Sequence, residues 1–360
     1  MSDDPEENQT PGADEEAPAE KARPDPPWLT ADVEWGIRAR PDAHGLRFSA
    51  LNLGTYGEVP AYWDNKTEIP RGAIPNPAVE KMPYSIYDKA EVWSDLCADL
   101  YEEAIQRRWS SSEAVPWDSL SPLDADVERA VCQLATALSE YGWMKAQTVG
   151  RWLQEISYGF IEVKLFLSTV VFDSARLFEV FRKRALANGG GLGRGGRNIR
   201  LMPLTQSLTF SEYVVALILH DSFTLTLLGQ GARLARNPAE ATIYRLCGQD
   251  IARHLSYATD HMRYLLLHEP DRREEIHRYL NKAEYYLAQD GDDTVYSALA
   301  VLLANGREPA AQALPAVAEI RRGQVEAYLS RLETARLGDR RERLHNSLKA
   351  WAGIPLPEPA

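Results

Sequence analysis

RLCGQDIARHLSYATDHMRYLL, residues 245–266, is a stretch in which polar side chains recur at helical spacing inside an apolar sequence. Residues three or four apart share one face of a helix, so these side chains form a stripe: Gln249, Asp250, Arg253, His254, Tyr257 and His261. Burying an unpaired polar group costs roughly 2–7 kcal/mol. In a bundle core this stripe therefore has to be paired, hydrogen-bonded or bound to metal.

An earlier stretch, VKLFLSTVVFDSARLFEVFRKR at residues 163–184, carries the same signature. Asp173 and Arg176 stand three residues apart, as do Asp250 and Arg253. Asp–Arg contacts are charge-assisted and often bidentate, so two such helices can hold one another in register. The sequence therefore predicts two related helices that face each other.

Both stretches resemble the metal-binding helices of the ferritin-like diiron-carboxylate superfamily, which includes ribonucleotide reductase small subunits and diiron oxygenases. The resemblance covers roughly residues 86–290 and implies an all-α, ferritin-like helical bundle. In this superfamily two helices each supply a Glu-x-x-His pair, and two others each supply a carboxylate. Here Ser174 and Ile251 occupy the glutamate positions and Leu177 occupies one histidine position, so His254 alone is kept.

The resemblance also points to the two single carboxylates. Glu140 and Asp221 lie in apolar runs on the helices expected to precede the two signature helices. With His254 they form a remnant set of three metal ligands. For each residue an alternative stays open: Glu140 as an ion-paired carboxylate, Asp221 as a hydrogen-bonded core acid, and His254 as a core imidazole with satisfied hydrogen bonds.

Four further residues match the positions that orient the metal ligands in the superfamily, where Asp holds the histidines and Arg closes buried ion pairs: Asp173, Arg176, Asp250 and Arg253. These groups can join the two helices without metal. With Ser174, Leu177 and Ile251 at ligand positions, we expect no cofactor. The alternative is a single Fe or Mn ion, since such ions accept carboxylate and imidazole ligands.

Three functions follow from this interpretation. The first is a non-catalytic subunit that pairs with a metal-loaded diiron relative in an oxygenase complex, or that forms a homo-oligomer. The second is an O₂-dependent oxidoreductase with one metal at Glu140, Asp221 and His254. The third is an oligomeric structural protein, or one that binds an apolar ligand in a cavity lined by Ile251, Leu177 and Phe172.

Composition restricts the remaining classes. The chain has 360 residues, 44% of them hydrophobic, which is enough for a sizeable core. Of the formal charge of −12, residues 1–27 contribute −7 through nine acidic and two basic side chains, which leaves a body close to neutral. We therefore expect no nucleic-acid partner. No uninterrupted apolar run is long enough to span a membrane, and three widely spaced cysteines suit a reducing cytoplasm.

The expected organisation has four parts. Residues 1–27, rich in Pro, Glu and Asp, predict a disordered tail, and residues 28–85 predict an extended aromatic arm, because Pro and Gly at this density prevent long helices. The bundle follows at 86–290 and a helical extension at 291–360. Helices are expected at 86–108, 123–149, 151–187, 210–235, 238–268, 271–289, 293–304, 308–335 and 339–351, with a flexible glycine-rich crossover at 188–200.

Overall fold

The computed structural model describes residues 25–26, 28–29, 34, 36–74, 78–291 and 293–356. The chain divides into two compact units, Met1–Gly36 and Ile37–Ala360, and every described helix belongs to the second. The predicted disordered tail therefore lies almost wholly outside the described residues. Within the described residues there is no β-strand, and the second unit is an all-α bundle, as predicted.

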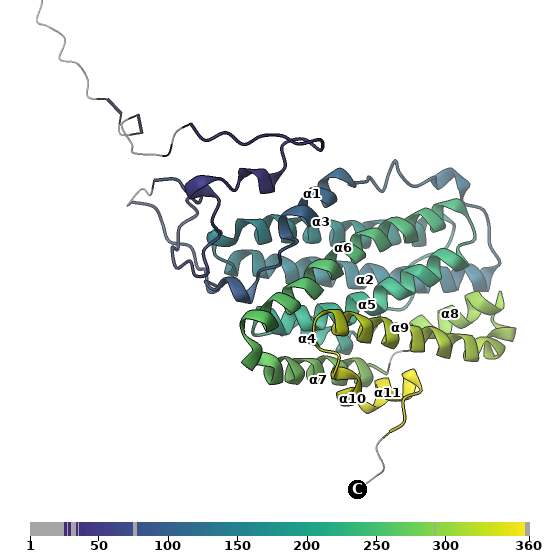
Figure 1. Ribbon diagram of the computed structural model, residues 1–360. Helices are drawn as coiled ribbons and strands as arrows, with labels where there is room; N and C mark the ends of the chain where they lie inside the picture. Colours follow the sequence, from purple (N-terminus) through teal and green to yellow (C-terminus); the bar gives the residue numbers. More distant parts are fainter. Residues whose placement is uncertain are drawn as a thin grey trace, which may run out of the picture. The chain divides into compact units, whose positions relative to one another are not determined.

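Four long helices form the core of the second unit: α2 (Ala125–Glu155), α3 (Ile161–Ala187), α5 (Phe210–Leu234) and α6 (Pro238–His268). Short connections make α2 antiparallel to α3 and α5 antiparallel to α6, and each pair is closely packed (Figure 1). The two pairs meet where α3 contacts α6. The two signature helices therefore face each other.

The second helix pair has clear boundary signals and a strongly apolar interior. The Asn237 side chain accepts a hydrogen bond from the Glu240 amide at 2.9 Å, and Pro238 occupies the first turn of α6. By length and composition, α5 is the one helix among the described residues that could cross a membrane, with a mean hydropathy of 1.3 in its most apolar window. That window is 72% buried inside the protein, so α5 is accounted for as the central helix of the bundle.

Several helix boundaries differ from the sequence prediction. The helix expected at 308–335 begins with a 3₁₀ turn, and the one expected at 339–351 is two short helices. Two other boundaries differ because capping residues interrupt the apolar period. In place of one helix over 86–108, a 3₁₀ turn capped by Asp88 precedes the shorter helix α1 (Cys97–Gln106). The first core helix continues to Glu155, and the break comes at Ser157, whose side chain accepts a hydrogen bond from the Gly159 amide.

The arm preceding α1 contacts the bundle through buried groups. The Arg71 guanidinium lies 2.6 Å from the Glu162 carboxylate at the start of α3, and both side chains are buried. Trp63 packs on Gly159 so closely that a Cβ there would lie 2.4 Å from the indole ring. A side chain larger than hydrogen at position 159 would therefore displace the arm.

The C-terminal helices cover α5. They are α7 (Arg273–Gln289), α8 (Thr294–Ala304), α9 (Leu314–Thr334), α10 (Arg340–Arg343) and α11 (Asn346–Ala352). Helix α9 packs on α5, and α8 packs on α2. A fully buried ion pair, with 2.7 Å between Arg340 and Glu284, ties α10 to α7. The remaining short elements are α4 (Met202–Thr205) and the 3₁₀ turns Phe48–Leu51, Gly54–Tyr56, Lys89–Glu91, Trp117–Ser119, Tyr158–Phe160, Ile199–Leu201, Pro270–Arg272 and Glu308–Ala313.

The glycine-rich crossover between α3 and α5 is held against α2. The Gly193 amide donates to the Thr136 hydroxyl at 2.7 Å, and the Gly196 amide donates to the Glu140 carboxylate at 3.1 Å. A Cβ at Gly190 would lie 2.4 Å from the sulfur of Cys132, so the backbone approaches α2 closely. The sequence predicted a flexible segment, but these contacts anchor it.

Candidate functional site

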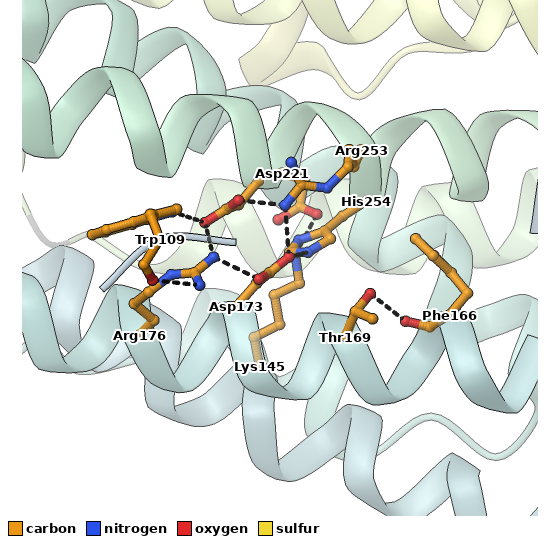
Figure 2. Close-up of polar contacts among 10 residues, drawn as sticks. Trp109, Lys145, Phe166, Thr169, Asp173, Arg176, Asp221, Arg253 and His254 are labelled. Carbon is orange, nitrogen blue, oxygen red and sulfur yellow. Dashed lines mark hydrogen bonds and ion pairs between the residues drawn. The ribbon is translucent and has the colours of Figure 1, made fainter. Parts of the chain in front are cut away.

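A lysine occupies the centre of the four-helix core. Lys145, from α2, is fully buried, and its Nζ lies 2.6 Å from Oδ2 of Asp221 on α5 and 2.8 Å from Nδ1 of His254 on α6 (Figure 2). The Tyr141 hydroxyl, one turn earlier on α2, donates to the other oxygen of Asp221 at 2.5 Å. The ammonium group therefore has an anionic and an imidazole partner, as a buried cation requires.

Crossed ion pairs join the two signature helices beside this lysine. Arg176 of α3 lies 2.6 Å from both Asp173 and Asp250, and Arg253 of α6 contacts the same two carboxylates (Figure 2). The Trp109 indole N–H donates to Asp250 at 3.0 Å, and its ring lies under the Arg176 guanidinium at 4.4 Å. The predicted Asp–Arg pairs between the helices are therefore present.

His254 links the lysine to this network. Its Nε2 lies 3.2 Å from Asp173, and Nδ1 faces Lys145. Burial lowers the pKa of His254, the charge of Lys145 lowers it further, and Asp173 opposes the shift. Burial also lowers the pKa of Lys145, against the opposing charge of Asp221. Neutral His254 is thus the form that suits a site already holding the lysine ammonium.

The formal charges of this buried centre balance. Asp173, Asp221 and Asp250 bring three negative charges, and Lys145, Arg176 and Arg253 bring three positive ones. Burial alone would raise the pKa of Asp173, but its hydrogen bond with His254 and the two arginine charges lower it. Because the centre is neutral, a divalent ion added here would bring charge that no group compensates.

Glu140 does not join Asp221 and His254. It lies next to Tyr141 but points to the crossover, where its carboxylate accepts the Gly196 amide. Across the described parts of the chain, no group of three or more His, Cys, Asp or Glu side chains is placed to hold a metal ion. The structure therefore brings Asp221 and His254 together but not Glu140, because Glu140 is one residue, about 100° of helix rotation, off the buried face of α2.

The substituted ligand positions are buried among apolar groups. Leu177 and Ile251 belong to the hydrophobic core, and the buried Ser174 hydroxyl has no hydrogen-bond partner. Two divalent irons need four carboxylates and two imidazoles, but here Asp221 and His254 are both held by Lys145. The residues present therefore do not fit a dimetal centre of the ferritin-like type.

Other polar residues near the signature helices serve elsewhere. Glu155 pairs with Arg151, while the buried His261 donates its Nδ1–H to the Trp93 carbonyl oxygen at 2.9 Å. Phe172 is 53% exposed, so it does not line an interior cavity with Leu177 and Ile251. The cavity expected from those three residues is therefore not formed by them.

Lys145 is the central residue that the sequence analysis missed. The signal was available in the spacing of α2, where residues three or four apart all prove buried: Leu134, Leu138, Tyr141, Lys145, Val149 and Trp152. A lysine within such a stripe has to find a buried anion. Matching positions to the superfamily drew attention to Glu140, a carboxylate, instead of this lysine.

A comparison with solved structures finds proteins whose backbone is similar to that of this chain. The likeness is to R2-like ligand-binding oxidases. One, with an aerobically reconstituted metal cofactor after photoconversion, has a TM-score of 0.48 at 15% identity over 66% of this chain and 92% of its own. Another, with an aerobically reconstituted Mn/Fe cofactor, has a TM-score of 0.49 at 15% identity over 67% and 93%. The all-α bundle that the resemblance to ribonucleotide reductase small subunits implied is confirmed by the helices of the second unit themselves.

No protein-family model and no curated protein matches this chain. The similar structures do correct one prediction. The sequence led us to expect no cofactor, whereas these R2-like oxidases are described with metal cofactors, Mn/Fe in the second case. That expectation is contradicted, and we withdraw it.

Proposed function

We propose that this ferritin-like, oxidase-type chain is a non-catalytic subunit of an oxygenase complex, in which a metal-loaded relative performs the chemistry. The observation that carries the proposal is the buried Lys145 ammonium, 2.6 Å from Asp221 and 2.8 Å from His254. This lysine engages the two side chains best suited to bind a catalytic metal. The polar groups in the core of the bundle therefore hold the helices together.

The environment of the lysine supports a structural role. Lys145 and Asp221 are fully buried, and His254 is 1% exposed, so none presents an atom to a substrate from solution. Burial, together with the charge of Asp221, raises the pKa of the Tyr141 hydroxyl well above its ordinary value, so this group stays a hydrogen-bond donor. The side chains of Asp221, His254 and Tyr141 are thus each committed to a partner inside the protein.

The expected partner is a relative of this bundle with both Glu-x-x-His pairs intact. The arm before α1 supports such pairing, since it presents exposed aromatic and aliphatic side chains, among them Leu46, Leu51 and Tyr62. Contact surfaces of this kind favour protein partners. A second copy of the chain is the competing partner, and the experiment below separates the two.

Oxygen consumption tests the catalytic part of the proposal. The purified chain is supplied with ferrous iron or manganese and a reductant, and the His254→Ala variant is the matched control. We expect the two proteins to consume O₂ at the same rate as the metal and reductant alone. Faster consumption by the natural chain, lost in His254→Ala, would overturn the proposal and make the chain an oxidase.

Co-expression tests the partnership. The chain is produced together with the Glu-x-x-His relative encoded nearest to its gene, and the molar mass of the product is measured by light scattering after size-exclusion chromatography. We expect a complex of fixed stoichiometry whose O₂-dependent activity exceeds that of the relative alone. A relative that is fully active by itself, beside a chain that assembles only with itself, would contradict the partnership.

A further inference from the structure

A pocket separate from the lysine centre lies where the bundle meets the C-terminal helices. It has a volume of about 240 Å³ and is lined by residues of α2, α5, α7, α8, α9 and α11 and of the turn Ile199–Leu201. Its wall includes Leu138 and Tyr141 from α2, Phe223 from α5, Tyr296 from α8 and Trp351 from α11. Apolar and aromatic groups thus provide most of its named surface, as in pockets that bind small molecules.

Two residues that line this pocket, His220 and Arg321, each have a buried nitrogen without a hydrogen-bond partner. His220 on α5 is 4% exposed and lines the pocket, yet its Nε2 makes no hydrogen bond. A buried polar atom left without a partner costs about 1–3 kcal/mol. The chain tolerates this cost at a place where a bound molecule could supply the missing hydrogen bond.

The state of the imidazole shows which kind of group would bind it. Burial, with a contribution from the positive charge of Arg200, lowers the pKa of His220 to about 3, so the ring is neutral at neutral pH. A hydrogen bond to the Arg200 backbone opposes the shift, the direction expected when the ring N–H donates to a carbonyl oxygen. Nε2 then carries the lone pair and requires a donor.

The charged groups at the pocket are paired with one another. The Arg321 guanidinium lies 2.5 Å from Asp293 and stacks over the Tyr296 ring at 3.8 Å. Arg200 lies 3.5 Å from Asp290. Two positive and two negative charges leave the pocket without net charge, so it favours a neutral molecule over an ion.

We propose that this pocket binds a small neutral molecule with an apolar, ring-sized body and one hydroxyl or N–H group, which donates to Nε2 of His220. The volume supports the size, since an apolar cavity of about 150 Å³ already holds benzene. Tyr141 connects the two sites, because it lines the pocket and donates to Asp221. The inference concerns binding alone and is independent of the proposed subunit function.

Phenol and toluene provide the test, since they differ by the one hydroxyl. Each is titrated into the full-length chain by calorimetry, with the His220→Phe variant as the control that keeps a ring but removes the acceptor. We expect phenol to bind with a Kd near 1 mM or lower and about tenfold more tightly than toluene, because one hydrogen bond is gained. In His220→Phe the two affinities should become equal.

Two results would overturn the inference: phenol binding no more tightly than toluene to the natural chain, or a phenol preference that persists in His220→Phe. A second measurement covers the case in which that variant does not fold. The ¹⁵N resonance of His220 Nε2 in the natural chain should move on adding phenol and stay in place on adding toluene, while the exposed His268 serves as the internal reference. An unmoved His220 resonance would equally reject the site.

Discussion

At the scale of single residues, the centre of this protein depends on the pairing of buried charge. Lys145 is as central as any of the predicted ligands, and its ammonium contacts Asp221 and His254 directly. The pairing of the Asp-x-x-Arg repeats could be predicted from sequence. A buried Asp or Arg requires a partner of opposite charge, and the two signature helices place these residues opposite each other. Lys145 was not predicted, although the spacing of α2 places it in a buried stripe, because the comparison with the superfamily concerned carboxylate positions and pointed to Glu140.

Removing the lysine charge should destabilise the fold strongly. Lys145→Met keeps most of the side-chain volume but leaves Asp221 with Tyr141 as its remaining partner, which costs about 3–5 kcal/mol for a broken buried pair. Urea unfolding measures this loss. Lys183→Met, which removes a partly exposed lysine 2.5 Å from Glu179, should cost less than about 1 kcal/mol. Equal losses in the two variants would contradict a structural role for Lys145.

Two buried histidines should make the stability depend on pH. Burial lowers the pKa of His220 to about 3 and that of His261 to about 4. Below about pH 6.5 the unfolded chain binds protons that the folded chain does not. The free energy of unfolding therefore decreases as the pH is lowered, by about 1.4 kcal/mol per pH unit for each histidine.

Urea unfolding between pH 7 and pH 4.5 checks this expectation. A His261→Phe variant should show a shallower pH dependence than the natural chain, whereas His268→Gln, at an exposed position, should leave the dependence unchanged. A natural chain equally stable at both pH values would show that these histidines are protonated in the folded state.

At the scale of helices, the long elements were predictable and their ends were less so. The apolar period of residues 210–268 gives α5 and α6 to within a residue, because Thr209 and Asn237 cap them. The bounds of α1 and α2 were displaced because Asp88 and Ser157 form local turns that the apolar period does not reveal. The helix ends at α1 and α2 were therefore mispredicted where short polar residues cap local turns.

The approach of α2 to α3 depends on one glycine. A Cβ at Gly142 would lie 2.7 Å from the Phe178 nitrogen and 2.8 Å from the Ser174 oxygen, both backbone atoms that cannot easily move. Gly142→Ala should therefore cost about 1–3 kcal/mol. Gly150→Ala in the same helix meets no atom within 4 Å and should stabilise by up to about 1 kcal/mol through helix propensity. Thermal unfolding measures the stability of both variants. A loss in Gly142→Ala beside a gain in Gly150→Ala would show that close packing, and not helix propensity, requires the glycine at position 142.

At the scale of the whole second unit, one hydrophobic core links the parts that the sequence had divided. It joins Trp63 of the arm to Tyr257 of the bundle and Leu348 of α11. The two signature helices were enough to predict an all-α bundle, since their facing stripes need other helices to cover them. The placement of the C-terminal helices on α5 was not predictable, because their apolar faces fit several neighbours equally well.

This shared core predicts cooperative unfolding of residues 37–356. Hydrogen exchange measured by mass spectrometry should give the same opening free energy for the buried amides of α9 and of α5. The contact that joins them is specific, with the Gln324 amide donating to the Phe223 carbonyl at 3.1 Å. Exchange of α9 at a much lower free energy than α5 would show that the C-terminal helices open on their own.

The dehydrated ammonium of Lys145 should also determine how long a folded molecule lasts. Its partners stand on different helices, so they assemble only when the bundle is nearly complete, and contacts formed that late slow unfolding more than they speed folding. A Lys145→Met/Asp221→Asn double variant, which removes both charges, should therefore unfold faster than its equilibrium stability suggests, as stopped-flow measurement in urea would record. The buried charge pair would then set the unfolding rate, and with it how often the bundle is exposed to proteases and chaperones.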